Sequence, residues 1–189
     1  MSAFVLGNGT SRLLTDITKL RPYGKIYGCN ALYREFDPDY LIAVDPKMIY
    51  EIQQTEYQKT HQVWTNLNSN HSYDHGFNYF NPRLGWSSGP SALTLATKHD
   101  HDIIYILGFD FSGINDKFNN VYAGTFNYKT SNDTATYWGN WQKQTEMVIK
   151  SNPHIKFYRV VEPNFYDTKW RYTNFKTMSY TEFNINISK

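Results

Sequence analysis

Short apolar runs and amphipathic segments alternate along most of this chain. Apolar runs bounded by turn-forming residues are typical of buried strands, and they predict strands at 3–6, 25–28, 40–44, 62–65, 102–109 and 155–161. Apolar residues at helical spacing behind capping residues predict helices at 10–20, 46–54, 88–98 and 136–151. Because strands and helices alternate, the pattern predicts an α/β fold with a mainly parallel sheet flanked by helices.

Three segments interrupt this alternation. Residues 66–86 and 112–133 are rich in polar and aromatic residues and are predicted to be long loop insertions. Loops of this length in a compact domain are usually functional, so we expect ordered binding loops. No period is clear in the last part of the chain. The prediction is one Rossmann-like domain over residues 1–189, with an α/β core at 1–161 and an irregular C-terminal extension at 162–189.

The composition excludes several classes of protein. Of the 189 residues, 40% are hydrophobic, 17% aromatic and 19% charged, which argues against a disordered chain. A formal net charge of +2 predicts no nucleic-acid partner bound through bulk charge. The longest apolar stretch, 103–109, is far shorter than the roughly 20 residues of a membrane-spanning helix. The single cysteine, Cys29, fits a reducing compartment, and with no signal segment recognised a cytoplasmic location is expected.

Glycines and polar residues gather where the predicted strands end. In open α/β sheets the ligand binds outside the carboxyl ends of the strands. These ends supply Gly7, Asn8, Gly9, Thr10, Ser11, Asn30, Asp45 and Asp110, and a helix start on the same side supplies Ser88 and Gly89. Helix starts offer free N–H groups suited to phosphate. The sequence therefore predicts an anion-binding crevice built from two helix N-termini, although each of them is also explained by an ordinary turn or cap.

The first loop departs from the dinucleotide fingerprint. Arg12 stands where G-x-G-x-x-G requires its last glycine, and Asn30 stands where an acidic residue would bind the ribose. These departures disfavour NAD and favour a mononucleotide or a nucleotide sugar.

Metal and nucleophile chemistry find little support. His71 and His75 lack the further ligands of a zinc site, and both D-x-D triplets precede strands, at the end of the sheet opposite the predicted site. No cofactor and no metal are therefore expected. Trp138 and Trp141 are three residues apart on one helix face, and they are interpreted as core or interface residues rather than as a sugar platform.

Four motifs occur in the order found in one enzyme family. They are GNGTS at 7–11, CNALY at 29–33, YFNPR at 79–83 followed by Ser88-Gly89, and IYILGFDF at 104–111. With these motifs the chain resembles the bacterial sialyltransferases of glycosyltransferase family 42. More distantly, it is similar to glycosyltransferase-like proteins linked to flagellin modification and to 6-hydroxymethylpterin pyrophosphokinase.

The resemblance implies a Rossmann-like domain that holds a CMP-sugar donor and uses no bound metal. It implies nucleotide and phosphate contacts for Asn8, Asn30 and the Ser88-Gly89 backbone, and donor contacts for Arg83 and Tyr137. The stretch from Tyr137 to Asn140 is similar to the family's segment with a catalytic histidine, but Asn140 stands in the place of that histidine. An amide cannot act as a general base near neutral pH.

The first hypothesis is a metal-independent glycosyltransferase that transfers a sugar from a nucleotide sugar to a glycan or another hydroxyl acceptor. Asp45 or Asp110 would replace the missing base, and Arg83 or Arg12 would neutralise charge on the leaving group. The alternative is a catalytically inactive Rossmann-like binding or structural module, such as a virus could encode. A pterin or nucleotide pyrophosphokinase is a third hypothesis. The sequence leaves open whether the chain forms a homo-oligomer.

Overall fold

A computed structural model describes residues 1–66 and 76–187 of the chain. Its centre is one eight-stranded sheet with the order β5-β4-β3-β2-β1-β6-β7-β8. All neighbouring strands pair in parallel, so the predicted α/β fold is confirmed. The strands are β1 (Ser2–Leu6), β2 (Gly24–Cys29), β3 (Tyr40–Ile42), β4 (Val63–Asn66), β5 (Phe77–Phe80), β6 (Ile103–Leu107), β7 (Lys156–Val160) and β8 (Phe175–Met178).

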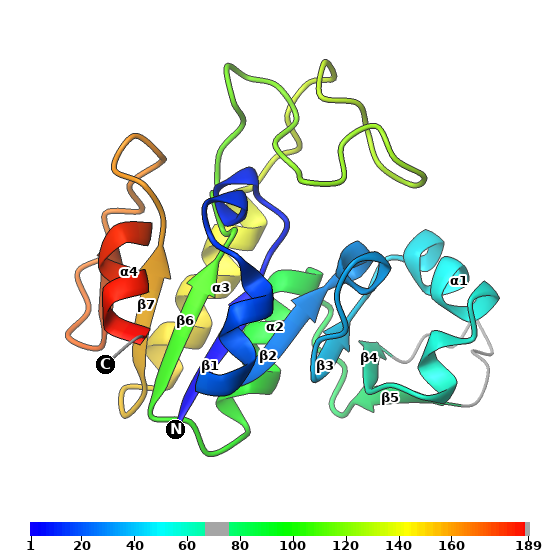
Figure 1. The fold of residues 1–189 in the computed structure, drawn as a ribbon, viewed down its shortest axis with the longest axis horizontal. Helices are drawn as coiled ribbons and strands as arrows, with labels where there is room; N and C mark the ends of the chain where they lie inside the picture. The colour runs from blue at the N-terminus through cyan, green and yellow to red at the C-terminus, as the bar shows by residue number, and fades with distance from the viewer. Residues whose placement is uncertain (67–75, 188–189) are drawn as a thin grey trace.

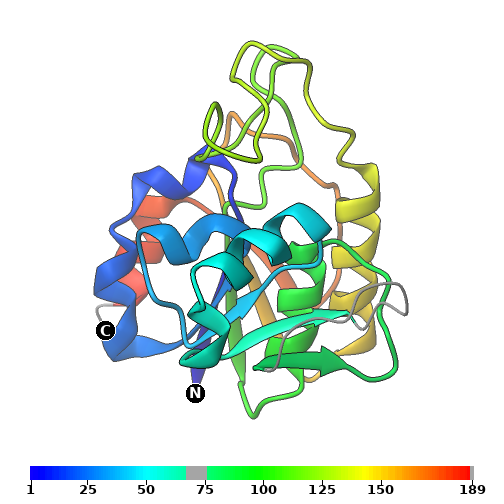
Figure 2. The same ribbon diagram turned by 90° about the vertical axis from the view of Figure 1, so that its right-hand side faces the viewer.

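Helices cover both faces of the sheet (Figures 1 and 2). The α-helices are α1 (Pro46–Gln54), α2 (Ser88–Thr97), α3 (Gly139–Ser151) and α4 (Tyr180–Ile187). The 3₁₀ helices are η1 (Thr10–Leu14), η2 (Ile17–Tyr23), η3 (Asn30–Arg34) and η4 (Tyr57–Lys59). Such two-sided cover explains why the strand sequences are apolar runs rather than alternating patterns.

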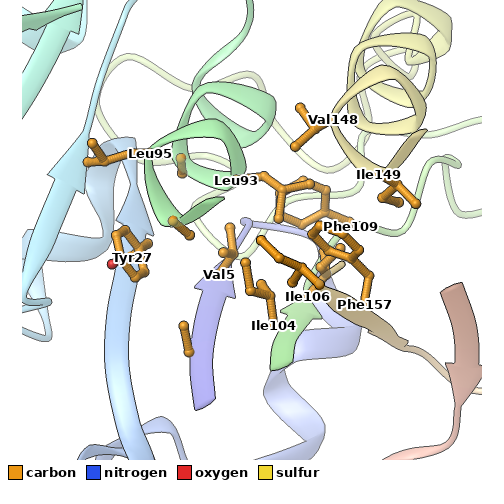
Figure 3. Packing of buried hydrophobic residues seen from close by; sticks show 14 of the residues in the cluster. Val5, Tyr27, Leu93, Leu95, Ile104, Ile106, Phe109, Val148, Ile149 and Phe157 are labelled. Atoms are coloured by element: carbon orange, nitrogen blue, oxygen red, sulfur yellow. The ribbon is translucent and has the colours of Figure 1, made fainter. Parts of the chain in front are cut away.

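The sheet divides the core into two layers, and the side chains of β1 and β6 contribute alternately to both. Val5 and Ile106 pack against α2 and α3, where Leu93 and Val148 point toward the sheet (Figure 3). Their neighbours Phe4 and Leu107 pack on the other face, in a cluster built with η2, η3, α1 and α4. Successive side chains of a strand point to opposite faces, so one apolar run serves both layers.

The segment predicted as a helix at 10–20 forms two 3₁₀ helices instead. The break falls at Thr15 and Asp16, and the Asp16 side chain accepts a hydrogen bond from the backbone N–H of Thr18 at 3.1 Å. Aspartate favours such local caps over a helix interior. Pro22, which lies beyond the end of the predicted helix, is inside η2.

Two further expectations are corrected at the edges of the sheet. The loop predicted at 66–86 contains β5, and the tail predicted as irregular contains β8 and α4. Both strands bury only their first and last residues, as in FKTM of β8, so neither shows a strand period. Each forms because β4 or β7 offers a free parallel edge. In α4, Phe183 is fully buried and meets the Phe4 ring edge to face.

The insertion between β6 and α3 contains neither a strand nor a helix and forms two isolated bridges, Ile114 with Lys117 and Lys117 with Thr134. In Figure 1 it arches above the end of the sheet toward which the strand arrows point. None of the helices in the described ranges is long and apolar enough to cross a membrane.

Candidate functional site

The strand order reverses between β1 and β6, and a cavity of about 500 Å³ lies at the carboxyl ends of these two strands. Ligands of open α/β sheets bind at such a switch point. The cavity is lined by eight of the residues that the sequence singled out: Gly7, Asn8, Gly9, Asn30, Asp45, Ser88, Gly89 and Asp110. Gly9 and Gly89, which lie 80 positions apart in the sequence, therefore meet at one site.

The first helix start is closed by the protein itself. The N–H of Gly9 donates to the Gly108 carbonyl at 2.9 Å, that of Thr10 to Asn119 Oδ1 at 3.0 Å, and that of Ser11 to Asp110 Oδ2 at 3.1 Å. The backbone N–H groups of Gly9, Thr10 and Ser11 are therefore not left for a phosphate. The expected anion site over Gly9 and Thr10 is therefore absent here, and neither Thr10 nor Ser11 lines the cavity.

The glycines of this loop are required by its neighbour. A Cβ on Gly7 would lie 2.6 Å from the Gly108 carbonyl oxygen, and one on Gly9 would lie 2.5 Å from the Asp110 carboxyl group. Gly108 itself has a φ of +69°, which glycine adopts at little cost. The glycines thus allow two strand-end loops to touch.

Asp110 organises this contact. Its buried carboxylate accepts hydrogen bonds from the Ser11 N–H, the Ser11 hydroxyl and Asn119 Nδ2. Arg159, which is 1% exposed, donates to the backbone carbonyls of Phe109 and Asp110 at 2.9 Å. Burial lowers the pKa of Arg159 to about 10, so the guanidinium stays charged at neutral pH. Because both carboxylate oxygens are engaged, Asp110 is poorly placed to take a proton from a substrate.

The second helix start, that of α2, is open. Its N-cap Ser87 makes no side-chain cap, and its third residue is Pro90, which has no N–H. The first intrahelical bond is donated by Ser91 to the Ser87 carbonyl. The backbone N–H groups of Ser88 and Gly89 have no acceptor in the described part of the chain, and both residues line the cavity. Free N–H groups and the positive end of the helix dipole favour an anion at this place.

Ser88 connects this helix start to two strands. Its buried hydroxyl donates to Asn30 Oδ1 at 2.8 Å and accepts from the N–H of Val44 at 3.2 Å. Asn30 follows β2 in the left-handed region, with a φ of 52°, which asparagine tolerates better than most residues. The ends of β2 and β3 are thereby fixed against α2.

Asp45 comes directly after Val44 in the sequence and lies at the mouth of the cavity. Its carboxylate makes no hydrogen bond and no ion pair within residues 1–66 and 76–187, and it does not cap α1. Desolvation by the cavity walls raises the pKa of Asp45 above its ordinary value. An unpartnered carboxylate with a raised pKa has the character of a general base.

Asn8 and Cys29 line the inner part of the cavity. Asn8 is 9% exposed, and its Nδ2 donates to the Cys29 carbonyl at 3.3 Å, whereas its Oδ1 has no partner in the described ranges. A buried acceptor without a donor costs free energy, which a ligand N–H or O–H could recover. Burial raises the pKa of the Cys29 thiol to about 12, so it is not a nucleophile at neutral pH.

The insertion is tied across the mouth by side chains of η1, η3 and α1. Arg34 binds Glu51 with two bonds of 2.6 Å, and it also donates to the hydroxyl of Thr125 and the carbonyl of Phe126. Asn127 donates to Glu51 at 2.8 Å. These bonds hold Tyr128 and Lys129 over the cavity, which both of them line.

Several residues that the sequence analysis predicted for the site lie outside the cavity. Arg83 and Asn140 are exposed, Tyr137 is 74% exposed, and none of the three lines the cavity. Arg12 is buried, where it donates to Glu35 at 3.1 Å and to the hydroxyl of Tyr122, so it is not available to a leaving group. His71 and His75 lie outside the described residues.

The described ranges contain no group of three His, Cys, Asp or Glu side chains that could hold a metal ion. In the D-x-D triplets, Asp39 pairs with Lys25 at 2.7 Å and Asp102 pairs with the N-terminus.

Sequence reasoning missed the residues that build the site from a distance. Asn119 sits in an asparagine pair within the insertion, and Arg159 lies inside a strand, KFYRV, whose other charged residue, Lys156, stands at its exposed start. The charge of Arg159 inside a buried strand was the one available signal of its role. Charged side chains are almost never fully buried without partners.

No protein-family model, no curated protein and no solved structure matches this chain.

Proposed function

We propose that the chain binds a nucleotide sugar in this cavity and transfers its sugar to an acceptor hydroxyl without a metal ion. The observation that carries the proposal is the open start of α2, with two unpartnered N–H groups, facing a cavity at the switch point of the sheet. These N–H groups would hold the donor's phosphate. The four motifs that resemble those of family 42 support a nucleotide sugar as the donor.

Polar groups beside the helix start suit the nucleoside. Asn8 Oδ1 offers an unused acceptor, and Asn30, fixed by Ser88, has an amide nitrogen with no partner in the described part of the chain. Pockets that bind small ligands combine a few such placed polar groups with apolar walls.

The transfer step assigns Asp45 as the base. Its carboxylate takes the proton of the acceptor hydroxyl while the acceptor oxygen attacks the anomeric carbon. The bond between that carbon and the donor phosphate breaks, and its electron pair leaves with the phosphate oxygen. The N–H groups of Ser88 and Gly89 stabilise the charge that develops there. The engaged carboxylate of Asp110 and the outward-lying Asn140 take no part.

Isothermal titration calorimetry with CMP, UDP, GDP and AMP tests the binding. We expect at least one nucleotide to bind with a Kd well below 1 mM. Asn30→Asp keeps the acceptor for Ser88 but places a negative charge beside the phosphate, so it should weaken binding about tenfold or more. Asn140→Asp makes the same charge change outside the cavity and should leave binding within about twofold. Binding weaker than millimolar for all four nucleotides would refute the proposal.

A second function, binding without catalysis, is favoured by one observation. Arg83 and Tyr137, the donor contacts implied by the resemblance, lie outside the cavity. If nucleotides bind, but no nucleotide sugar of the tightest-binding base is consumed with or without acceptors, the chain is a binding module that has retained the fold and lost the chemistry.

A further inference from the structure

Two tryptophans form a wall of the cavity that the proposed function does not use. Trp138 is the N-cap of α3, Trp141 lies in its first turn, and both line the cavity. Side chains three apart lie on the same helix face. Trp138 packs partly against the core, whereas Trp141 keeps 37% of its surface exposed. The interpretation of both as core or interface residues is therefore incomplete, because Trp141 is open to the cavity.

The tryptophan wall begins where the phosphate site ends. The backbone N–H of Ser87 donates to Gln144 Oε1 at 3.1 Å, which holds α3 beside the start of α2. On its other flank the start of α2 is held to Asn30 by Ser88. In Figure 1, α2 lies between α3 and β3. The open N–H groups thus separate a polar wall, where Asn30 and Asp45 lie, from an aromatic one.

The charges around the cavity indicate what the aromatic wall accepts. The charged side chains that line it, within the described ranges, are Asp45, Asp110 and Lys129. The Lys129 ammonium donates to the Thr134 carbonyl at 3.4 Å. Arg83, the residue implied for a donor carboxylate, is exposed outside the cavity. A sugar acid would therefore meet more negative charge than positive, with no arginine to pair with.

The insertion supplies further polar groups to the lining of this cavity. Asn120 uses its Oδ1 to accept from the N–H of Tyr122, and Asn127 uses its Nδ2 to donate to Glu51. The other amide atom of each side chain has no partner in the described part of the chain, and both residues line the cavity. One donor and one acceptor match what neighbouring sugar hydroxyls require.

From this arrangement we infer that Trp138 and Trp141 are a stacking platform for an uncharged pyranose ring. The sugar handled by this chain is then a neutral hexose rather than a sialic acid. The C–H faces of a pyranose are apolar and fit a rigid indole surface, while its hydroxyls bind the amides at the rim. The inference rests on the proposed function only in placing donor phosphate and sugar in the same cavity.

Saturation-transfer NMR and titration with the methyl glycosides of glucose, galactose, mannose and N-acetylglucosamine test the platform, with N-acetylneuraminic acid as the anionic probe. We expect at least one neutral glycoside to bind. Trp141→Ala should weaken it about tenfold, the loss of one aromatic contact, and Trp141→Phe should recover part of it. Tyr137→Ala removes an exposed aromatic ring one residue before Trp138 but outside the cavity, and it should have no effect.

The outcomes separate this inference from the proposed function. Binding of the sialic acid but of no neutral glycoside overturns the inference, and so does neutral binding that survives Trp141→Ala. Loss of nucleotide binding in Trp141→Ala, with sugar binding kept, assigns the platform to the base and also overturns it. If glycosides bind as expected while no nucleotide binds, the platform stands and the proposed function fails.

Discussion

Replacing Asp110 tests whether this residue organises the site or performs chemistry in it. Asp110→Ala removes the acceptor for the N–H of Ser11, at 3.1 Å, and for Asn119 Nδ2, at 2.9 Å, and it also frees the Ser11 hydroxyl. The buried N–H of Ser11 is then left without an acceptor, at a cost of about 1–3 kcal/mol, whereas the partly buried Asn119 Nδ2 keeps its bond to the Ser112 carbonyl at 3.2 Å. With the lost bonds of the Ser11 hydroxyl and Asn119 added, we expect a loss of about 3 kcal/mol, a large part of a domain stability of about 5–15 kcal/mol.

Asp110→Asn provides the matched comparison. One amide oxygen can accept both N–H donors, and the amide nitrogen can donate to the Ser11 hydroxyl. Only the charge is lost, since charge-assisted hydrogen bonds are about twice as strong as neutral ones. The expected cost is about 1–2 kcal/mol. Asp45→Ala, at a carboxylate without a partner in the described residues, should change stability by no more than about 0.5 kcal/mol.

Urea unfolding followed by tryptophan fluorescence measures these differences as shifts of the midpoint at constant slope. The reasoning is refuted if Asp110→Ala costs less than about 1 kcal/mol, or if Asp110→Asn costs as much as Asp110→Ala. Either result would mean that the contact between the two strand-end loops does not depend on this carboxylate.

The remaining predictions concern three other positions around the cavity. The raised pKa of Asp45 means that the native state keeps this proton to a higher pH than the unfolded chain does. The contribution of Asp45 to stability therefore falls as the pH rises above about 4. Asp45→Asn should stabilise the protein at pH 7 and not at pH 3, and thermal unfolding at both pH values would show this. Ser88→Ala breaks two hydrogen bonds and should cost about 1–2 kcal/mol and weaken nucleotide binding, whereas Ser91→Ala, one turn further along α2 at a buried hydroxyl without a partner in the described residues, should do neither. Cys29, buried with a pKa of about 12, should react with a thiol reagent only after unfolding; rapid reaction of the native protein would contradict its burial.

The fold follows from the sequence where apolar runs are long and covered on both faces. β1 and β6 bury their side chains against helices on either side, so their runs are visible without any knowledge of neighbours. The edge strands β5 and β8 are different, because FNYF and FKTM gain their strand conformation from the edge that they join. A local pattern cannot show that partner.

For the site, the sequence alone determined which residues stand at the carboxyl ends of the strands, since that depends only on where each apolar run stops. It could not determine which hydrogen-bonding groups of those residues are bonded within the protein and which stay free for a ligand. The tertiary structure closed the turn at Gly9 with Asp110 and Asn119 and left the start of α2 open. It also turned Trp141 toward the cavity and Asn140 toward solvent. The physical reason is that a donor or acceptor is available to a ligand only when no other part of the folded chain reaches it first.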